Sequence, residues 1–275
     1  MALFCPAGTH YQIFGTPNKG HYAHLGAHQN TLVFIHGMGL DLNLWQEQVK
    51  SLGTDYQIIT YDLLGHGLSP HAPSDISLHT LAEQLRQLLL HLHLEKVHLI
   101  GFSLGGLVAR VFATQYHHRL ASLTIMSSVF DRSQGLRESI LTRLVEVERH
   151  GPSANIDQAL ARWFSPLYTQ THTPYLLQLR AKVLANHALS YSRCYRLFAQ
   201  GDNAVQDKLK KITCPTLVTT GALDPGSTPA MSHALAAKIN SAKVSILPEA
   251  RHMMPVEKAS QVNALIEEFI GAHRL

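Results

Sequence analysis

Cysteine is scarce in this sequence. Three such residues, Cys5, Cys194 and Cys214, stand far apart among 275 residues, and no two of them form a CxxC pair. An odd number of widely spaced cysteines gives no disulfide framework and is typical of a reducing compartment. A chain of this length with 45% hydrophobic residues has enough apolar surface to build a core without disulfides or metal ions.

Long hydrophobic runs are also missing. No stretch approaches the roughly 18 apolar residues that a membrane-spanning helix requires, so we expect no membrane partner. The opening segment from Met1 to Pro6 lacks the basic stretch and apolar run of a signal peptide. We therefore predict a soluble, cytoplasmic protein.

Charged residues are few and nearly balanced. They make up 15% of the chain, and 23 Lys and Arg against 19 Asp and Glu leave a net charge of +4. Such an excess provides no concentrated basic face, so we expect no nucleic-acid partner.

Histidine, by contrast, is abundant. Protonation of all 19 histidines would add 19 to the net +4 and give +23, so we expect mild acid to destabilise the fold. The spacing of close pairs such as His91 and His93 turns the side chains apart on a helix. We attribute these pairs to composition and predict no metal site and no cofactor.

Short apolar runs alternate with helical patterns along the chain. The strand-like runs are Thr31–Ile35, Gln57–Tyr61, Val97–Phe102, Leu120–Met126, Thr216–Thr220 and Val244–Leu247. The predicted helices are Leu44–Leu52, Leu78–Leu92, Leu104–Tyr116, Met231–Lys238 and Ser260–His273. This alternation predicts an α/β fold with a mostly parallel, twisted sheet and helices on both faces. The opening segment, with Gly8, Gly15 and Gly20, predicts an antiparallel hairpin at the sheet edge.

The alternation stops between about Asp131 and Lys211. This stretch has no strand-like run and predicts several helices, with breaks at Gly151-Pro152, Ser165-Pro166, Thr173-Pro174 and Gly201-Asp202. We therefore predict a core of residues 1–130 and 212–275 and an inserted helical cap of residues 131–211. The cap is either simply part of the fold or a cover over a site at the strand ends.

The strongest functional motif is Gly101-Phe102-Ser103-Leu104-Gly105, which matches G-x-S-x-G. It follows a predicted strand directly and begins a predicted helix. A sharp turn in this context strains the serine backbone and exposes its Oγ at the helix N-terminus. Backbone N–H groups and the helix dipole favour developing negative charge there. We predict Ser103 to be a catalytic nucleophile.

A second motif, His36-Gly37-Met38-Gly39, follows the predicted strand Thr31–Ile35. A glycine-flanked turn at this place can aim the Met38 N–H at the point that the Leu104 N–H also faces. Two such donors form an oxyanion hole, so we predict Met38 and Leu104 for this role.

An acid and a base follow later in the chain. Asp224 ends the segment Gly221–Asp224 after one predicted strand, and His252 follows the last one. An acid on a strand-end turn can orient a histidine ring, and the chain order Ser103, Asp224, His252 is that of α/β-hydrolases. The rival acids are Asp131, Asp202 and Asp207.

These motifs resemble those of the α/β-hydrolase fold superfamily across nearly the whole chain. The matching segments are His36–Gly39, Tyr61–Ser69, Gly101–Gly106, Gly221–Asp224 and His252. In capped members of this superfamily the D-x-x-G-x-G-x-S turn shapes a loop, so we interpret Asp62 and Ser69 as structural. The segment Arg162–Pro166 is similar to small carboxylesterases and enol-lactone hydrolases.

One position departs from the family pattern. The family often has glycine before the catalytic histidine, whereas this chain has Arg251. The backbone there must avoid positive φ or be strained, and Arg251 is also a candidate for substrate contact.

The resemblance implies a serine hydrolase that cleaves a carboxylic ester or lactone through an acyl-enzyme, without a cofactor. The same residues also suit a C–C bond hydrolase or a cofactor-free perhydrolase. A non-catalytic ligand receptor is a rival of another class. Ser103 argues against the dehalogenases and epoxide hydrolases of this fold, because those use aspartate as nucleophile. The sequence leaves the oligomeric state open.

Positive charge gathers in the predicted cap. From Arg132 to Gln200 nine basic residues face four acidic ones, so this stretch carries +5 and the rest of the chain −1. Either these are ordinary solvated helix faces, or the cap attracts an anionic substrate. In the second case one inward-pointing arginine would hold a carboxylate through two parallel hydrogen bonds, but the sequence does not identify it.

Overall fold

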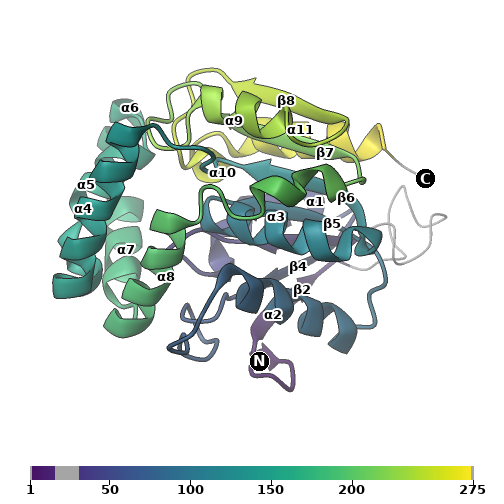
Figure 1. Ribbon diagram of the computed structural model, residues 1–275, viewed down its shortest axis with the longest axis horizontal. Helices are drawn as coiled ribbons and strands as arrows, with labels where there is room; N and C mark the ends of the chain where they lie inside the picture. Colours follow the sequence, from purple (N-terminus) through teal and green to yellow (C-terminus); the bar gives the residue numbers. More distant parts are fainter. Residues whose placement is uncertain (1, 16–30, 274–275) are drawn as a thin grey trace.

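The computed structural model describes residues 2–15 and 31–273, and Gly20 of the predicted hairpin lies outside the described residues. The described residues form one eight-stranded sheet (Figure 1). Its strands are β1 (Leu3–Phe4), β2 (His10–Phe14), β3 (Thr31–Ile35), β4 (Gln57–Tyr61), β5 (Val97–Phe102), β6 (Leu120–Met126), β7 (Thr216–Gly221) and β8 (Ala242–Leu247). They lie in the order β1-β2-β4-β3-β5-β6-β7-β8.

Strands β3 to β8 run parallel, whereas β1 and β2 form an antiparallel hairpin that pairs with the edge of β4. Every residue of β3 and of β5 is buried, because helices cover both faces of a parallel sheet. This burial explains the continuous apolar runs in the sequence. The predicted α/β fold, with a mostly parallel sheet and helices on both faces, is confirmed.

Helices pack on both faces of the sheet. In Figure 1, α2 (Leu78–His91), α3 (Leu104–Tyr116) and α9 (Pro229–Ala236) lie in front of it. On the opposite face, α1 (Gln46–Leu52) packs against α10 (Met254–Glu257) and α11 (Ala259–Gly271). The helix predicted to begin at Leu44 starts as a 3-10 helix, η3 (Leu42–Trp45). A second 3-10 helix, η4 (His117–Arg119), follows α3.

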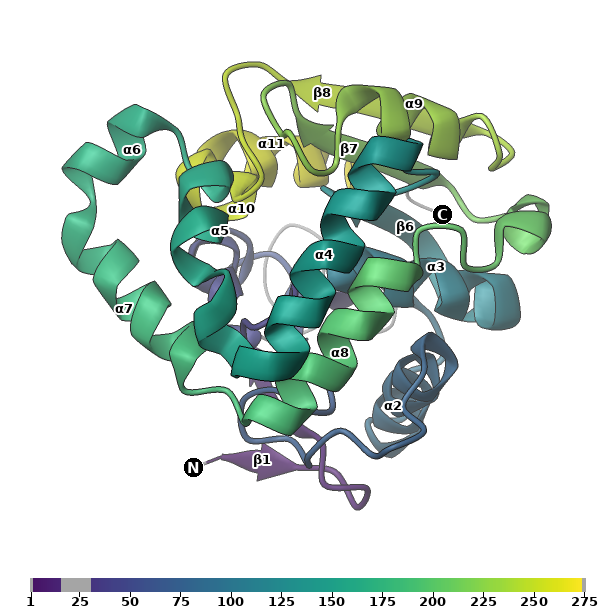
Figure 2. The same ribbon diagram turned by 60° about the vertical axis from the view of Figure 1, so that its left-hand side comes forward.

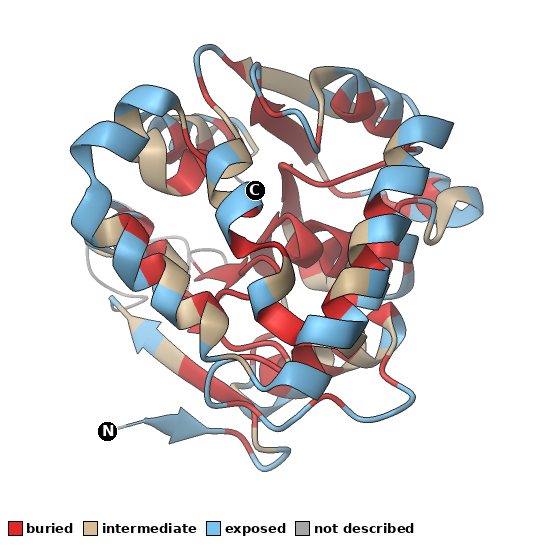
Figure 3. Cartoon of the chain, turned by 90° about the vertical axis from the view of Figure 1, so that its left-hand side faces the viewer, coloured by how far each residue is buried: buried red, intermediate tan, exposed pale blue. Residues whose placement is uncertain are grey.

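The chain between β6 and β7 is mostly helical. It forms α4 (Gln134–His150), η5 (Gly151–Ala154), α5 (Ile156–Trp163), α6 (Pro166–Thr171), α7 (Thr173–Leu184), α8 (Ala188–Gln200) and η6 (Gln206–Lys211). Figures 1 and 2 place α4 to α8 beyond the carboxyl ends of the strands. Figure 3 shows these helices with buried residues on their inward sides and exposed residues on their outward sides. A separate cap domain of residues 131–211 remains a prediction.

Three further features concern the cysteines, membrane-spanning helices and metal-binding groups. Cys5, Cys194 and Cys214 are all free and buried. No described helix combines the length and the apolar character that crossing a bilayer demands. Among the described residues, no group of three or more His, Cys, Asp and Glu side chains is placed to hold a metal ion.

Candidate active site

The strand order brings the predicted site residues to one edge of the sheet. Strand β3 pairs with β4 on one side and with β5 on the other, so the chain changes direction across the sheet at this point. Ligands of open α/β sheets bind outside the carboxyl ends of strands at such a switch point. Ser103 follows β5, and the loop from His36 to Asp41 follows β3.

Ser103 has a strained backbone. Its φ of 55° and ψ of −114° lie in a region that L-residues seldom adopt, at a cost of about 1–3 kcal/mol. Its N–H donates to the Met126 carbonyl oxygen at 2.8 Å, which anchors the turn to β6. A Cβ on Gly105 would lie 2.4 Å from the Ile35 carbonyl oxygen, so only glycine lets α3 begin this close to β3.

The structure brings Ser103, His252 and Asp224 into one line. His252 Nε2 lies 3.2 Å from Ser103 Oγ, and His252 Nδ1 lies 2.7 Å from Asp224 Oδ2. All three residues are buried. The other carboxylate oxygen of Asp224 accepts hydrogen bonds from the N–H groups of Gly226 and Ser227, both at 2.9 Å. The carboxylate therefore holds the proton on Nδ1 and leaves Nε2 free to accept one from the serine.

The rival acids lie in other environments. Asp131 and Asp207 are exposed. Asp202 is buried, but its Oδ2 accepts from the backbone N–H of Arg132 at 3.0 Å, and its Oδ1 lies 3.5 Å from Arg132 Nη1. Asp202 thus joins the two ends of the helical segment α4 to α8.

The His252 loop contacts helix α5 at several points. The Trp163 ring stacks over the His252 ring with centroids 6.3 Å apart, and the Met253 N–H donates to the Trp163 carbonyl oxygen at 3.0 Å. Arg251 has no positive φ, so the arginine in place of the family's glycine carries no such strain. Its Nη1 donates to the Ala161 carbonyl oxygen at 2.9 Å, which ties this loop to α5.

The loop after β3 lies directly against the serine. A Cβ on Gly37 would lie 3.2 Å from Ser103 Cβ, so the neighbouring Met38 stands close to the serine. Leu104 is the first residue of α3, and the first amides of a helix have no acceptor within it. Both amides are therefore in the region where an oxyanion would need donors.

Two buried histidines hold this loop. No role was predicted for either of them from the sequence. His36 Nδ1 donates to the Gly37 carbonyl oxygen at 2.8 Å, and its Nε2 accepts from Leu63 N–H at 3.0 Å. His66 Nε2 accepts from Gly39 N–H at 3.1 Å. Burial lowers the pKa of His36 and is the main cause that lowers the pKa of His66 to about 3. Both rings are therefore neutral, as acceptance of a backbone N–H requires.

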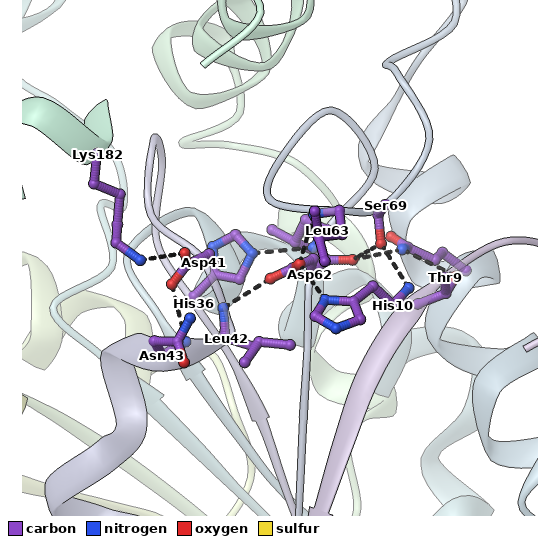
Figure 4. Close-up of polar contacts among 12 residues, drawn as sticks. Thr9, His10, His36, Asp41, Leu42, Asn43, Asp62, Leu63, Ser69 and Lys182 are labelled. Carbon is purple, nitrogen blue, oxygen red and sulfur yellow. Dashed lines mark hydrogen bonds and ion pairs between the residues drawn. The ribbon is translucent and has the colours of Figure 1, made fainter. Parts of the chain in front are cut away.

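Asp62 connects the neighbouring loops, as Figure 4 shows. Its carboxylate accepts from Leu42 N–H at 2.8 Å and from Leu68 N–H at 2.9 Å, and lies 2.7 Å from His10 Nδ1. Ser69 Oγ donates to the Asp62 carbonyl oxygen at 2.7 Å. These contacts join loops to one another and match the structural interpretation of Asp62 and Ser69.

Helix α7 reaches the same loop from the other side. Lys182 forms an ion pair with Asp41, drawn in Figure 4. Asn186 Nδ2 donates to the Gly39 carbonyl oxygen at 3.0 Å. The segment that carries Met38 is thus held by one side chain of α7 and by another that directly follows α7, both more than 140 residues away in the sequence.

A cavity lies beside Ser103 and His252, between the sheet and the helices α4, α5 and α8. Its apolar wall is formed by Ile140, Trp163, Tyr191, Tyr195 and Phe198. Two cationic side chains, Arg143 and Arg162, also line it. The sequence alone did not identify which arginines of this segment point inward.

Comparisons with known proteins agree with this architecture. The family described as the alpha/beta hydrolase fold matches residues 30–259. The chain is 29% identical over 241 residues to an (E)-2-((N-methylformamido)methylene)succinate hydrolase of Acinetobacter baylyi, with 87% of this chain and 89% of the relative covered. It is 28% identical over 247 residues to 3-oxoadipate enol-lactonase 2 of the same organism, with 90% and 91% covered.

A solved structure is similar over almost the whole chain. The enol-lactonase from Burkholderia xenovorans LB400 superposes with a TM-score of 0.84 at 25% sequence identity. The match covers 96% of this chain and 97% of the other. The likeness to enol-lactone hydrolases that the sequence suggested is therefore confirmed.

Proposed function

Because this chain belongs to the α/β hydrolase fold family, we propose that it is a serine hydrolase that cleaves a carboxylic ester or lactone of a small molecule. The observation that carries the proposal is the continuous contact from Asp224 through His252 to Ser103, at 2.7 and 3.2 Å. These distances and the strained serine backbone suit nucleophilic catalysis. The relatives described above support the coarser statement, that the protein is a hydrolase.

The reaction follows from the geometry in two halves. Ser103 Oγ attacks the carbonyl carbon while His252 Nε2 takes its proton, and Asp224 stabilises the imidazolium. The amides of Met38 and Leu104 hold the tetrahedral oxyanion. His252 then gives its proton to the leaving oxygen, and the acyl group remains on Ser103. A water molecule, deprotonated by the same histidine, cleaves the acyl-enzyme and releases the acid.

The substrate is proposed to be an anion. The two relatives are named for a succinate and for 3-oxoadipate, both of which are carboxylic acids. The +5 balance from Arg132 to Gln200 supports the same class, because a cationic cover raises encounter rates with anions. We further propose that α4 to α8 form a cap over the site and that the protein works in the cytoplasm, where free cysteines stay reduced.

A substrate screen and a covalent probe test this function. The purified protein should hydrolyse members of a panel of esters, lactones and enol-lactones, and EDTA should leave the rate unchanged. A fluorophosphonate should label Ser103, as mass spectrometry of the digested protein would reveal. Absence of labelling and of turnover would indicate a ligand receptor. Faster cleavage of a vinylogous diketone than of any ester would indicate a C–C bond hydrolase.

A further inference from the structure

We propose that Arg143 of α4 and Arg162 of α5 together bind a carboxylate of the substrate, in the cavity that also contains Ser103. This inference rests on the proposed hydrolysis of an ester or lactone and names its substrate class. The substrate would carry one free carboxylate at the arginines and its scissile carbonyl at the serine. Both arginines line the same cavity as Ser103 and His252.

The contacts of the basic residues between Arg132 and Gln200 distinguish Arg143 and Arg162 from the others. Five of the nine basic residues between Arg132 and Gln200 are paired with carboxylates: Arg132, Arg137, Arg180, Lys182 and Arg196. Arg193 donates to the Ala72 carbonyl oxygen at 2.7 Å, and Arg149 is exposed. Arg143 and Arg162 are the two that remain, and they are the two that line the cavity.

Within the described part of the chain, no carboxylate is within ion-pairing distance of either guanidinium. Arg143 donates from Nη1 to Ser139 Oγ at 3.2 Å, while its buried Nε has no hydrogen-bond partner. Burial and, next in size, the charge of Arg143 lower the pKa of Arg162. Two partly buried cations that repel each other are both stabilised when an anion enters between them.

The chemistry of the cavity defines the ligand further. A guanidinium presents planar, parallel N–H donors that match the two oxygens of a carboxylate. The same cavity is also lined by apolar and aromatic residues such as Ile140, Tyr195 and Phe198. Such a lining suits a short hydrocarbon chain. The class is therefore a monoester or lactone of a short dicarboxylic acid, because one carboxylate then stays free.

A matched pair of substrates tests the inference. One is a 4-nitrophenyl ester of adipic acid with its second carboxylate free, and the other is the same ester with that carboxylate methylated. The kcat/KM ratio of the free acid to the methyl ester should exceed 1 at low salt and decrease as salt is added. Arg143→Gln or Arg162→Gln should lower this ratio by about 10- to 100-fold, the range for a charge-assisted hydrogen bond.

Two control variants separate binding from folding. Arg149→Gln removes an exposed arginine from the same helix α4 and should leave the ratio unchanged. Arg162→Lys keeps the positive charge and should retain more of the ratio than Arg162→Gln. A ratio of 1 or less in the wild-type protein, or an equal ratio in wild type and both Gln variants, would overturn the inference while the hydrolase remained.

A binding measurement tests the arginines without turnover. Monomethyl adipate should bind Ser103→Ala in calorimetry at least about 10-fold more tightly than dimethyl adipate, and Arg143→Gln or Arg162→Gln should abolish the difference. This measurement does not depend on turnover. If the carboxylate bound but no ester were hydrolysed, only the proposed function would be refuted. Equal binding of the two esters to Ser103→Ala would refute the carboxylate site.

Discussion

At the scale of single residues, the line from Asp224 to Ser103 depends on groups that have no freedom to move. The Asp224 carboxylate is fixed by the N–H groups of Gly226 and Ser227, and the Ser103 backbone is held by Met126. The His252 ring lies between them under Trp163. A ring held on three sides loses little entropy when it transfers a proton.

Substitution of Ser103 or of Asp224 should have a large effect on the rate. Ser103→Ala should lower kcat on the order of 10⁶-fold, because members of such a unit fail together. Asp224→Asn should lower it on the order of 10⁴-fold, because an amide favours the wrong tautomer of the histidine. Initial rates on an ester found in the screen, with thermal unfolding as a check of the fold, measure both.

The exposed acid Asp131 provides the matched control. Asp131→Asn should keep nearly full activity, because this carboxylate is exposed. Near-full activity of Asp224→Asn together with inactivity of Asp131→Asn would show that the acid has been assigned incorrectly.

Residues at strand ends could be predicted from the sequence, whereas those on helices α4 to α8 could not. Ser103, Asp224 and His252 follow apolar runs that identify strands, and the ends of parallel strands share one edge. The inward direction of Arg143 and Arg162 depends on how α4 and α5 dock, and no local pattern encodes that. His36 and His66 lie in segments that match the family, but no role was predicted for them, because the backbone N–H groups that they accept from are set by the packing of two separate loops.

At the scale of elements, the loop after β3 is shared between the sheet and helix α7. The Ser103 turn packs against it from one side, while Lys182 and Asn186 bind it from the other. The position of α7 therefore affects the donor at Met38. The start of α8 could not be predicted, because the segment Ala185-Asn186-His187 between α7 and α8 contains no glycine or proline. In the structure His187 is the N-cap of α8, and its side chain accepts a hydrogen bond from Ser190 N–H.

Loss of the α7 contacts should slow the reaction more than it weakens binding. Asn186→Ala and Lys182→Met should each lower kcat by about 10-fold, because small misplacements of catalytic donors are costly. KM should change less, since neither residue lines the cavity beside Ser103. Steady-state kinetics on one ester gives both numbers. Gln178→Ala, exposed on the same helix, should match the wild type, and an Asn186→Ala effect confined to KM would contradict this role.

At the scale of the whole molecule, the buried neutral histidines link stability to pH. The folded state keeps His66 neutral down to a pKa of about 3, against 6.5 for an unperturbed histidine, and the pKa of His36 is also lowered. Below pH 6.5 these histidines therefore bind protons in the unfolded chain that they do not bind in the folded chain. The free energy of unfolding must decrease as the pH falls through this window and is fully retained above it.

Urea unfolding at several pH values measures this linkage. His66 should remove about 1.4 kcal/mol from the free energy of unfolding per pH unit below 6.5, and the lowered pKa of His36 should add to this loss. His66→Gln, which keeps an acceptor for Gly39 N–H, should reduce the slope by about one such increment. His118→Gln, at an exposed position, should leave the slope nearly unchanged. A stability independent of pH between 6.5 and 4 would refute the account.

The hydrogen bond between Arg132 and Asp202 has a consequence for how proteins of this kind diversify. It brings the two ends of the α4 to α8 segment to one place at the sheet, with 3.0 Å between Arg132 N and Asp202 Oδ2. A segment that leaves and returns at a single point can be lengthened, shortened or exchanged without displacing the strands on either side. Because Ser103, Asp224 and His252 lie outside that segment while Arg143 and Arg162 lie inside it, the residues proposed for bond cleavage and those proposed for carboxylate binding can evolve separately.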